Sequence, residues 1–537
     1  MSTTYVRHVH LRAAAANQRA VAAPWRTTWL SRCHLSRPLH QAATPTGDEA
    51  SISARHEERP QPIKKLRLAV KDNIVTRDFD TTCGSNILAG CRIPFDATIV
   101  SQLTAEERGG GGMTVVVGKT AMDEFGMGTH STTSALFGPV HNAAPLEAYS
   151  AGGSSGGSAV AVRTGEADLA LGTDTGGSVR MPAAYTGTVG FKPSYGMLSR
   201  WGVVPYANSL DTVGLMARTV APIRHAVIGL GLYKEHDPVD PTSLPTSVRE
   251  RCTRQREGYD PETKPIKRFT GLTFGLPVEY NIAELDSRIR QGWLAALETI
   301  QDLGGRVVPV SLPSTKNALS AYYVIAPAEA SSNLAKYDGI RYGRRDTGGP
   351  SDAQDGVLYA RTRGTGFGSE VKRRILLGSY TLSSEAIDNY FVQAQKVRQL
   401  VRRDFDRVFK LDNPLLDEQH FELSEMDESI GLESKLGPAQ VDFLVCPTAP
   451  TTPPLLEDVS KQTPFDSYMN DVFTVPASLA GLPAISIPMR IRVDPAKEEQ
   501  RLLHFGGLQL IGQFWDDARV LSVAERLSEY ISPTVGK

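Results

Sequence analysis

Two serines in glycine-rich segments are the residues best suited to chemistry. Ser154 lies in the segment AGGSSGGS, and Ser178 follows 24 residues later in TDTGGSVR. Gly176 and Gly177 allow the backbone to turn so that several N–H groups converge beside the Ser178 hydroxyl. Convergent donors next to a hydroxyl are the components of an oxyanion hole and its nucleophile. This pattern favours acyl transfer at Ser178, with the backbone of Thr175–Ser178 holding the oxyanion.

A serine hydroxyl needs a base to take its proton, and neither glycine-rich segment contains a histidine. Lys71 is the alternative base, because it ends the segment LRLAVK, whose alternating pattern predicts a strand. Burial lowers the pKa of a lysine, so its amine could be neutral and accept a proton. Ser154 could relay that proton from Ser178. On the residues alone, Lys71 could also form a surface salt bridge, with Ser154 an ordinary loop residue.

Other catalytic motifs are present only in part. The segment GMTVVVGKT resembles a phosphate-binding loop, but Met113 stands where that loop needs a glycine, so we interpret Lys119 as structural. The segment GGSSG matches the GxSxG pattern of a nucleophile elbow, but the residues before it form a poor strand. No clustered spacing typical of metal ligands is found in the sequence.

Strands and helices must position these residues. We predict strands over 66–71, 114–118, 167–174 and 306–312. A helix is expected to begin near Ser178, and a longer one over about 286–303, where Asp286 or Ser287 can cap the start. Strands that alternate with helices of this length indicate an α/β fold with a mixed central sheet covered by helices on both faces.

Composition limits the class of protein. The chain has 537 residues, a net charge of −1 and 41% hydrophobic residues, which does not favour direct binding of nucleic acid. Five cysteines without a CxxC pair predict reduced thiols. No apolar run reaches the length needed to span a bilayer. We expect one large domain over about 60–537, with surface insertions near 105–112 and 411–437, the second of them strongly acidic.

The N-terminal segment differs in kind from the rest. Residues 1–46 contain six arginines, several serines and threonines and no acidic residue. They also lack the continuous apolar stretch of a secretory signal. This composition is typical of an organelle transit peptide, and a basic disordered tail is the alternative. We expect residues 1–46 to be a mitochondrial transit peptide.

The glycine-rich segments, taken together, resemble the amidase signature family. The resemblance is carried by GGSSGGSAVAV, by LALGTDTGGSVRMPAAYTGTVGFKPSYG and by LAVKDNI, and it extends from about residue 66 to the C-terminus. It implies that Lys71 is the base, Ser154 the bridging serine after a cis peptide bond, and Ser178 the nucleophile that forms an acyl ester. It also implies the single-domain fold of that family.

Within the family, four further segments resemble the glutamine-hydrolysing component of tRNA-dependent amidotransferases: GKTAMDEFGMGTHSTTSALFGPVHN, EASSNLAKYDGIRYG, GSEVKRRILLGSYTLSS and MNDVFTVPASLAGLPAISIP. This resemblance implies a glutamine pocket in which Arg374 holds the α-carboxylate, Asp471 holds the α-ammonium and Tyr322 lines the wall. Arginine suits the first role because its fork matches a carboxylate. The alternative is that these are surface charges and a core tyrosine.

The resemblance also implies the reaction and its partners. Ammonia from glutamine would pass to a B subunit, which uses ATP and Mg²⁺ to activate the glutamate of misacylated Glu-tRNA(Gln) and makes most of the tRNA contacts. A small third subunit is expected, while this chain needs no cofactor of its own. The compartment would be the mitochondrial matrix. A free-standing amidase of the same family and a non-catalytic scaffold subunit are the rival hypotheses.

Overall fold

The computed structural model describes residues 65–105, 113–256, 266–346, 358–416, 440–492 and 505–532. All of them belong to one compact unit that spans Pro62–Lys537. The expected transit peptide at 1–46 lies outside the described residues, as does most of the two expected insertions.

Ten strands in the described part of the chain form one mixed sheet with the order β2-β1-β3-β5-β4-β9-β10-β8-β6-β7. The strands are β1 (Leu66–Lys71), β2 (Thr114–Thr120), β3 (Leu169–Asp174), β4 (Val189–Lys192), β5 (Thr212–Ala217), β6 (Thr273–Pro277), β7 (Arg306–Val310), β8 (Phe443–Pro447), β9 (Ala484–Arg490) and β10 (Phe505–Ile511). Pairs at the two ends of the sheet are parallel, and those in the middle are antiparallel. Every residue of β3, β4 and β5 is buried, as expected for strands covered on both faces.

Helices connect and cover these strands. They are α1 (Thr98–Thr104), α2 (Gly156–Thr164), α3 (Arg180–Thr186), α4 (Val220–Arg224), α5 (Thr246–Arg254), α6 (Ser287–Asp302), α7 (Ala318–Asn333), α8 (Ala360–Gly366), α9 (Ser369–Thr381), α10 (Phe391–Val408), α12 (Leu456–Val459), α13 (Pro464–Met469), α14 (Val475–Ala480) and α16 (Asp517–Ile531). Short 3-10 and π turns lie between them. No helix among the described residues is long and apolar enough to cross a membrane.

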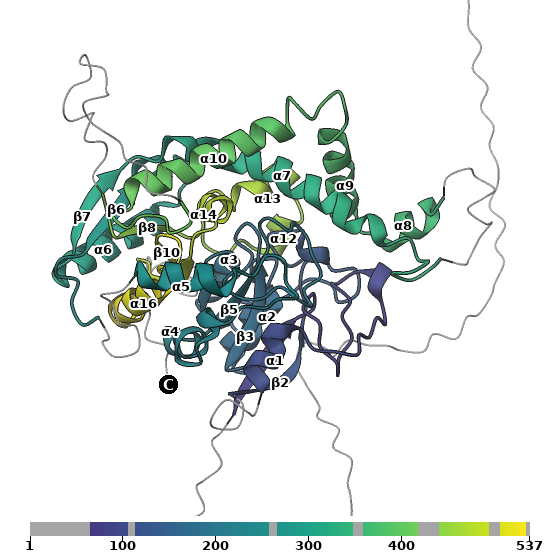
Figure 1. Cartoon of the computed structure of the whole chain (residues 1–537), viewed down its shortest axis with the longest axis horizontal. Helices are drawn as coiled ribbons and strands as arrows, with labels where there is room; N and C mark the ends of the chain where they lie inside the picture. Colours follow the sequence, from purple (N-terminus) through teal and green to yellow (C-terminus); the bar gives the residue numbers. More distant parts are fainter. Residues whose placement is uncertain are drawn as a thin grey trace, which may run out of the picture. The chain divides into compact units, whose positions relative to one another are not determined.

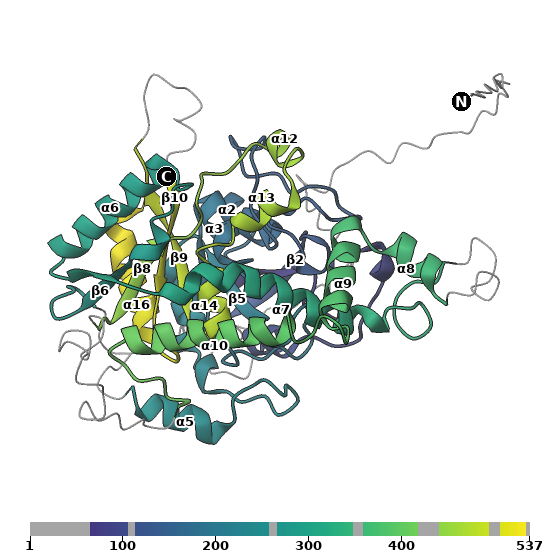
Figure 2. The same ribbon diagram turned by 90° about the horizontal axis from the view of Figure 1, so that it is seen from above.

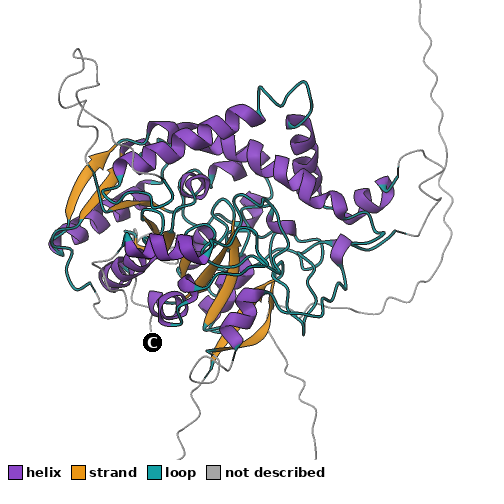
Figure 3. Cartoon of the chain, viewed as in Figure 1, coloured by secondary structure: helices purple, strands orange, loops and turns teal. Residues whose placement is uncertain are grey.

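Neighbouring glycines of β10 show that helices pack on opposite faces of the sheet. A Cβ on Gly506 would meet Ile289 of α6, whereas a Cβ on Gly507 would meet Ala184 of α3. Because successive residues of a strand point to opposite faces, α6 and α3 cover different sides. The helix α16 packs against α6, and α2 packs against α3. Figure 3 shows the strands enclosed between these helices.

A further group of helices lies beside the sheet. The helices α7 and α10 run side by side in both ribbon views (Figures 1 and 2), α9 packs against α7, and α14 lies next to α7 and α10. The helices α7 and α9 contribute Tyr322 and Arg374, two of the residues predicted for the glutamine pocket. The residues predicted for this pocket therefore lie on elements far in sequence from the two serines.

The predicted fold class is confirmed, and most predicted elements lie where the sequence places them. The strand expected at 66–71 is β1, and the helix expected over 286–303 is α6, whose N-cap Asp286 accepts a hydrogen bond from the N–H of Arg288. The helix expected to begin near Ser178 is α3, which begins at Arg180, and the N–H of Met181 already bonds to the Gly177 carbonyl in the helical pattern. The Asp174 carboxylate accepts from the N–H groups of Val179 and Arg180 and so satisfies donors at the start of this helix.

Candidate active site

Lys71 ends β1 inside the protein, and its side chain is fully buried. Its Nζ donates to Ser154 Oγ at 2.8 Å and to Thr173 Oγ1 at 2.9 Å. The parallel pairing of β1 with β3, in which Val70 faces Leu171, brings Lys71 to this part of β3. Lys71 therefore lies in the interior and beside Ser154, as the hypothesis of a buried base requires.

Burial lowers the pKa of Lys71 to about 7 from its ordinary value of 10.5. The carboxylates of Asp123, Asp174 and Asp211 act in the opposite direction and favour the charged amine. Desolvation is the larger effect, because an ammonium loses most of its hydration in an apolar interior. A substantial fraction of the Lys71 amine is therefore neutral near pH 7 and able to accept a proton.

Ser154 is held in a loop built around Asp123. The peptide bond between Gly153 and Ser154 is cis, and the Ser154 carbonyl accepts from the N–H of Asp123 at 3.3 Å. The Asp123 carboxylate in turn accepts from three successive N–H groups, those of Ser131, Thr132 and Thr133, at 2.8 to 3.1 Å. A Cβ on Gly153 would lie 2.3 Å from Asp123 Oδ2. Close packing against this carboxylate explains why glycine precedes the bridging serine.

Ser178 lies beside the other serine segment and is the more accessible of the two. Its carbonyl accepts from the N–H of Ser155 at 3.1 Å, so the two glycine-rich segments are neighbours in space. Ser178 is partly exposed, whereas Ser154 is buried. No direct hydrogen bond joins the Ser154 and Ser178 hydroxyls among the described residues. This arrangement lets a substrate reach Ser178 while the amine of Lys71 stays shielded.

The backbone around Ser178 offers unused donors. Within the described part of the chain, the N–H groups of Thr175–Ser178 make no hydrogen bond. Buried or half-buried N–H groups are almost always paired, so four consecutive unpaired donors in one turn form a ready site for a developing negative charge. Gly177 has φ +145°, in the region that favours glycine.

Three side-chain contacts fix this turn. The Asp174 carboxylate pairs with Arg180, whose Nη2 lies 2.8 Å from Oδ1, and both side chains are completely buried. Thr175 donates to Asp211 at 2.7 Å, and Thr474 donates to the Gly176 carbonyl at 2.6 Å. The turn Thr175–Ser178, the predicted oxyanion turn, is therefore held from the end of β3, from the residue before β5 and from the start of α14.

Tyr322 lies directly against the oxyanion turn. A Cβ on Gly176 would be 2.6 Å from Tyr322 Cζ and 2.7 Å from its hydroxyl oxygen. Tyr322 is buried on α7, and its ring packs edge-on against Tyr323 at 4.9 Å between centroids. The sequence-based placement of Tyr322 in the wall of the site agrees with this position.

Tyr323 contacts both Asp471 and Arg374. Tyr323 donates to Asp471 Oδ2 at 2.8 Å, and the Arg374 guanidinium lies over the Tyr323 ring at 5.4 Å. Both charged groups are buried, which contradicts the alternative that they are surface charges. Burial raises the pKa of Asp471 to about 7, although the Tyr323 hydroxyl and Arg374 lower it. The site thus combines one fixed cation with one carboxyl group that titrates near neutral pH.

Several residues that hold the site were not identified from the sequence. They are Thr173, Asp123, Arg180, Asp211, Tyr206 and Glu370, which bond to residues of the site or to the turn that carries Ser178. Only Glu370 left a usable signal, because it stands four residues before Arg374, which is the spacing of neighbours on a helix. The others are brought in by loops whose paths the local pattern does not specify.

The structure also places Lys119 and four of the cysteines, which the sequence singled out. Lys119 donates to the Ile74 carbonyl at 2.6 Å and to Thr81 at 3.0 Å, as the interpretation of a structural lysine requires. The four described cysteines are free thiols. Among the described residues, no cluster of His, Cys, Asp and Glu could hold a metal ion.

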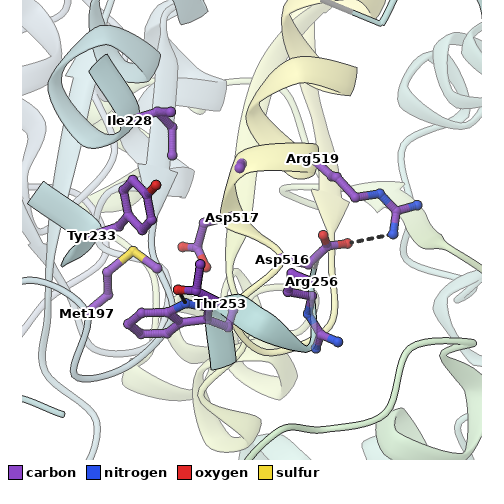
Figure 4. Close-up of a pocket in the computed structure, with 10 residues that line it drawn as sticks. Met197, Ile228, Tyr233, Thr253, Arg256, Asp516, Asp517 and Arg519 are labelled. Atoms are coloured by element: carbon purple, nitrogen blue, oxygen red, sulfur yellow. Dashed lines mark hydrogen bonds and ion pairs between the residues drawn. The ribbon is translucent and has the colours of Figure 1, made fainter. Parts of the chain in front are cut away.

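A cavity beside the start of α16 contains none of the predicted site residues. It is lined by Met197, Ile228, Tyr233, Thr253, Arg256 and residues 515–519. Figure 4 shows Asp517 between an apolar side and a side that carries Arg256, Asp516 and Arg519. Asp517 accepts from Ser194 at 2.6 Å, and Asp516 lies 3.5 Å from Arg519. The first contact joins α16 to the segment after β4 and the second lies within the start of α16, so we interpret the cavity as part of the packing of this helix.

Comparison with known proteins gives a consistent result. The family model described as Amidase matches residues 27–521. A protein from Podospora anserina, named as the mitochondrial A subunit of glutamyl-tRNA(Gln) amidotransferase, is 61% identical over 473 residues, which cover 87% of this chain and 90% of that protein. A protein of the same name from Neurospora crassa is 59% identical over 513 residues, covering 89% and 92%.

A solved structure agrees with these relatives. The crystal structure of the glutamyl-tRNA(Gln) amidotransferase A subunit from Thermotoga maritima superposes with a TM-score of 0.63 at 33% identity, over 88% of this chain and 86% of that one. The resemblance stated from the sequence is confirmed. The expected mitochondrial compartment is confirmed as well, since both fungal relatives are named as mitochondrial.

Proposed function

Since the chain belongs to the amidase family, we propose that it hydrolyses the side-chain amide of glutamine. The ammonia released serves to convert misacylated Glu-tRNA(Gln) to Gln-tRNA(Gln) in the mitochondrial matrix. The observation that carries this proposal is the 2.8 Å bond from Lys71 Nζ to Ser154 Oγ inside a site where Lys71 is fully buried. A buried neutral amine bonded to a hydroxyl, next to a turn of unpaired N–H groups, is equipped for acyl transfer.

The reaction begins with attack of Ser178 Oγ on the amide carbon of the substrate side chain. Its proton passes to Ser154 and from there to Lys71, which requires the Ser178 hydroxyl to turn toward Ser154 when substrate binds. Such contacts commonly tighten only in the substrate complex. The oxyanion is stabilised by the N–H groups of Thr175–Ser178. Each such donor lowers the barrier by about 3 kcal/mol.

Breakdown of the tetrahedral intermediate needs a proton on the departing nitrogen. The Lys71 ammonium supplies it through Ser154, and ammonia leaves. A γ-glutamyl ester then remains on Ser178. Water attacks this ester with the same residues acting as base and then as acid, which releases glutamate and restores the free hydroxyl.

Glutamine is recognised at its two charged groups. Arg374 binds the α-carboxylate, for which its planar fork is well matched. Asp471 binds the α-ammonium as a carboxylate, and Tyr322 lines the wall beside Gly176. A buried cation and a buried carboxyl group that both contact Tyr323 suit a zwitterionic substrate better than a neutral amide.

The transamidation itself takes place on partner chains. The relatives carry the name of one component of an amidotransferase, which indicates an assembly of several chains. We propose that a B subunit binds ATP, Mg²⁺ and most of the tRNA, and that a small third subunit completes the complex. The net charge of −1 agrees with a chain that does not itself grip the tRNA.

Replacement of the nucleophile tests the proposal. Ser178→Ala in the complete complex should abolish ammonia release from glutamine and leave glutamine binding intact. Ser158→Ala is the matched control, because Ser158 is a buried serine whose hydroxyl bonds to the Leu171 carbonyl at 2.9 Å. Unchanged activity of Ser178→Ala would contradict the proposal. Full activity of the isolated chain, insensitive to Arg374→Ala, would favour a free-standing amidase.

A further inference from the structure

The Arg374 guanidinium is held by two polar partners that no sequence motif indicated. Its Nε donates to Glu370 Oε1 at 2.7 Å, and its Nη1 donates to the Tyr206 hydroxyl at 2.6 Å. Tyr206 is 3% exposed and comes from a loop before β5, 168 residues away in sequence. Glu370 is a neighbour on α9 itself. Two bonds from different parts of the chain therefore determine the orientation of this cation.

Aromatic rings complete the enclosure. The guanidinium carbon lies 5.6 Å from the centre of the Tyr206 ring, and 5.4 Å from the centres of Tyr323 and Tyr468. Tyr323 and Tyr468 are themselves stacked, with centroids 4.0 Å apart. Tyr468 also donates to Glu370 at 2.9 Å. Packing of this kind leaves the guanidinium little freedom to tilt.

The hydrogen bonds to Glu370 and Tyr206 determine which N–H groups of Arg374 remain available to a substrate. A guanidinium has five N–H donors in one plane. Glu370 takes the donor on Nε and Tyr206 takes one of the two on Nη1. The other hydrogen of Nη1 and the pair on Nη2 make no bond to any described residue. A carboxylate can accept two parallel bonds from such an edge only if the plane of the fork is fixed.

Tyr206 is also tied to the oxyanion turn. Its backbone N–H and that of Ala207 donate to Asp211 Oδ2 at 2.8 and 3.0 Å. The other oxygen of this carboxylate, Oδ1, accepts from the Thr175 hydroxyl at 2.7 Å. The loop that carries Tyr206 and the turn that carries Ser178 therefore share one buried carboxylate. The distance between the α-carboxylate site and the oxyanion hole is set by this shared anchor.

We propose that Tyr206 is a positioning residue that determines specificity for an α-amino acid amide. Its hydroxyl orients Arg374 toward the substrate carboxylate. Its backbone N–H bonds to Asp211, which also binds Thr175, and so fixes the position of Arg374 relative to the oxyanion turn. The inference rests on the proposed glutamine hydrolysis and adds to it a determinant of substrate choice.

Tyr206→Phe is the direct test, because it keeps the ring over the guanidinium and removes only the hydroxyl. In the complete complex, KM for glutamine should rise about tenfold, the loss typical of one hydrogen bond to a charged group, while kcat changes less than about twofold. The second substrate is 4-aminobutanamide, which has the amine and the amide of glutamine but lacks the α-carboxylate. Its kcat/KM should stay unchanged, so the preference for glutamine falls about tenfold.

Tyr280→Phe is the matched control. Tyr280 is also 3% exposed, and its hydroxyl has no hydrogen-bond partner among the described residues. This variant should leave both substrates unaffected. In an Arg374→Lys background, Tyr206→Phe should change the KM for glutamine by less than about twofold, because the guanidinium that Tyr206 orients is no longer present.

Two outcomes would overturn the proposal. An equal loss for glutamine and 4-aminobutanamide would show that Tyr206 supports the structure only, and no change for either would show that its hydroxyl is dispensable. Failure of the proposed function is distinguishable, since the unmodified complex would then not hydrolyse glutamine at all.

Discussion

Glutamine hydrolysis should depend on pH through two buried groups at once. Lys71 and Asp471 both have a pKa of about 7, each moved there by burial from opposite sides of neutrality. Lys71 must be neutral to accept a proton, and Asp471 must be ionised to pair with the α-ammonium. Protonation of either group therefore inactivates the free enzyme, and both losses occur as the pH falls.

The size of the effect follows from these two values. The active fraction is the product of two deprotonated fractions, each of which is about one half at pH 7 and about one eleventh at about pH 6. Because kcat/KM reports the ionisations of the free enzyme, it should fall about a hundredfold from about pH 8 to about pH 6. If only one group with this pKa had to be deprotonated, kcat/KM would fall only about tenfold over the same range.

Initial rates of ammonia release from glutamine, measured across this range with the complete complex, provide the assay. Asp471→Asn removes one of the two groups, so its kcat/KM should be lower throughout and fall only about tenfold over the same interval. The value of kcat should show a single ionisation even in the unmodified protein, because bound ammonium keeps Asp471 ionised. A flat profile below pH 7, or the same steepness in Asp471→Asn, would refute the assignment of these roles.

Two further predictions concern the proton path. Lys71→Met should abolish hydrolysis, and it should stabilise the folded protein more near pH 7 than near pH 10. The pKa of Lys71 is lower in the folded state than in the unfolded state, so burying this residue costs stability most below about pH 7, and the difference in free energy of unfolding between the variant and the unmodified protein should shrink by about 3 kcal/mol as the pH rises to 10. Melting curves that show the same difference in melting temperature at both pH values would contradict this. Ser154→Ala should lower kcat by a factor of about 10² to 10⁴ with little change in KM, because the substitution interrupts proton transfer. Steady-state kinetics of the Ser158→Ala control should match those of the unmodified protein. A selective rise in the KM of Ser154→Ala would point to a binding role for Ser154 instead.

Local pattern was sufficient for the elements that carry the catalytic residues. The alternating segment that ends at Lys71 predicted a strand, which is β1, and the apolar run that ends at Asp174 predicted another, which is β3. Their parallel pairing, which a mixed sheet does not specify in advance, brings the amine to the serine segments. The burial of Lys71 could not be read from this alternation, because Lys71 lies on the face opposite to Leu68 and Val70; it is buried because the end of β1 is covered on both faces.

The rest of the site depends on contacts that local pattern cannot encode. The position of Ser154 relies on Asp123 accepting three N–H groups from a loop eight to ten residues further on. The orientation of Arg374 relies on Tyr206, from a separate loop. The start of α3 relies on the Asp174 carboxylate, which accepts from two of its first N–H groups. Each of these is a side-chain contact that the spacing of residue types does not reveal, and resemblance to a family supplied only the residues that touch substrate.

The most direct test of the central claim is detection of the acyl ester itself. The complete complex is mixed with isotopically labelled glutamine, quenched in acid within the first turnover, digested and analysed by mass spectrometry. The account predicts a peptide that contains Ser178 and has gained one glutamyl group through an ester, absent from Ser178→Ala. A glutamyl group on another residue, or ammonia released in the first turnover with no ester at Ser178, would contradict it.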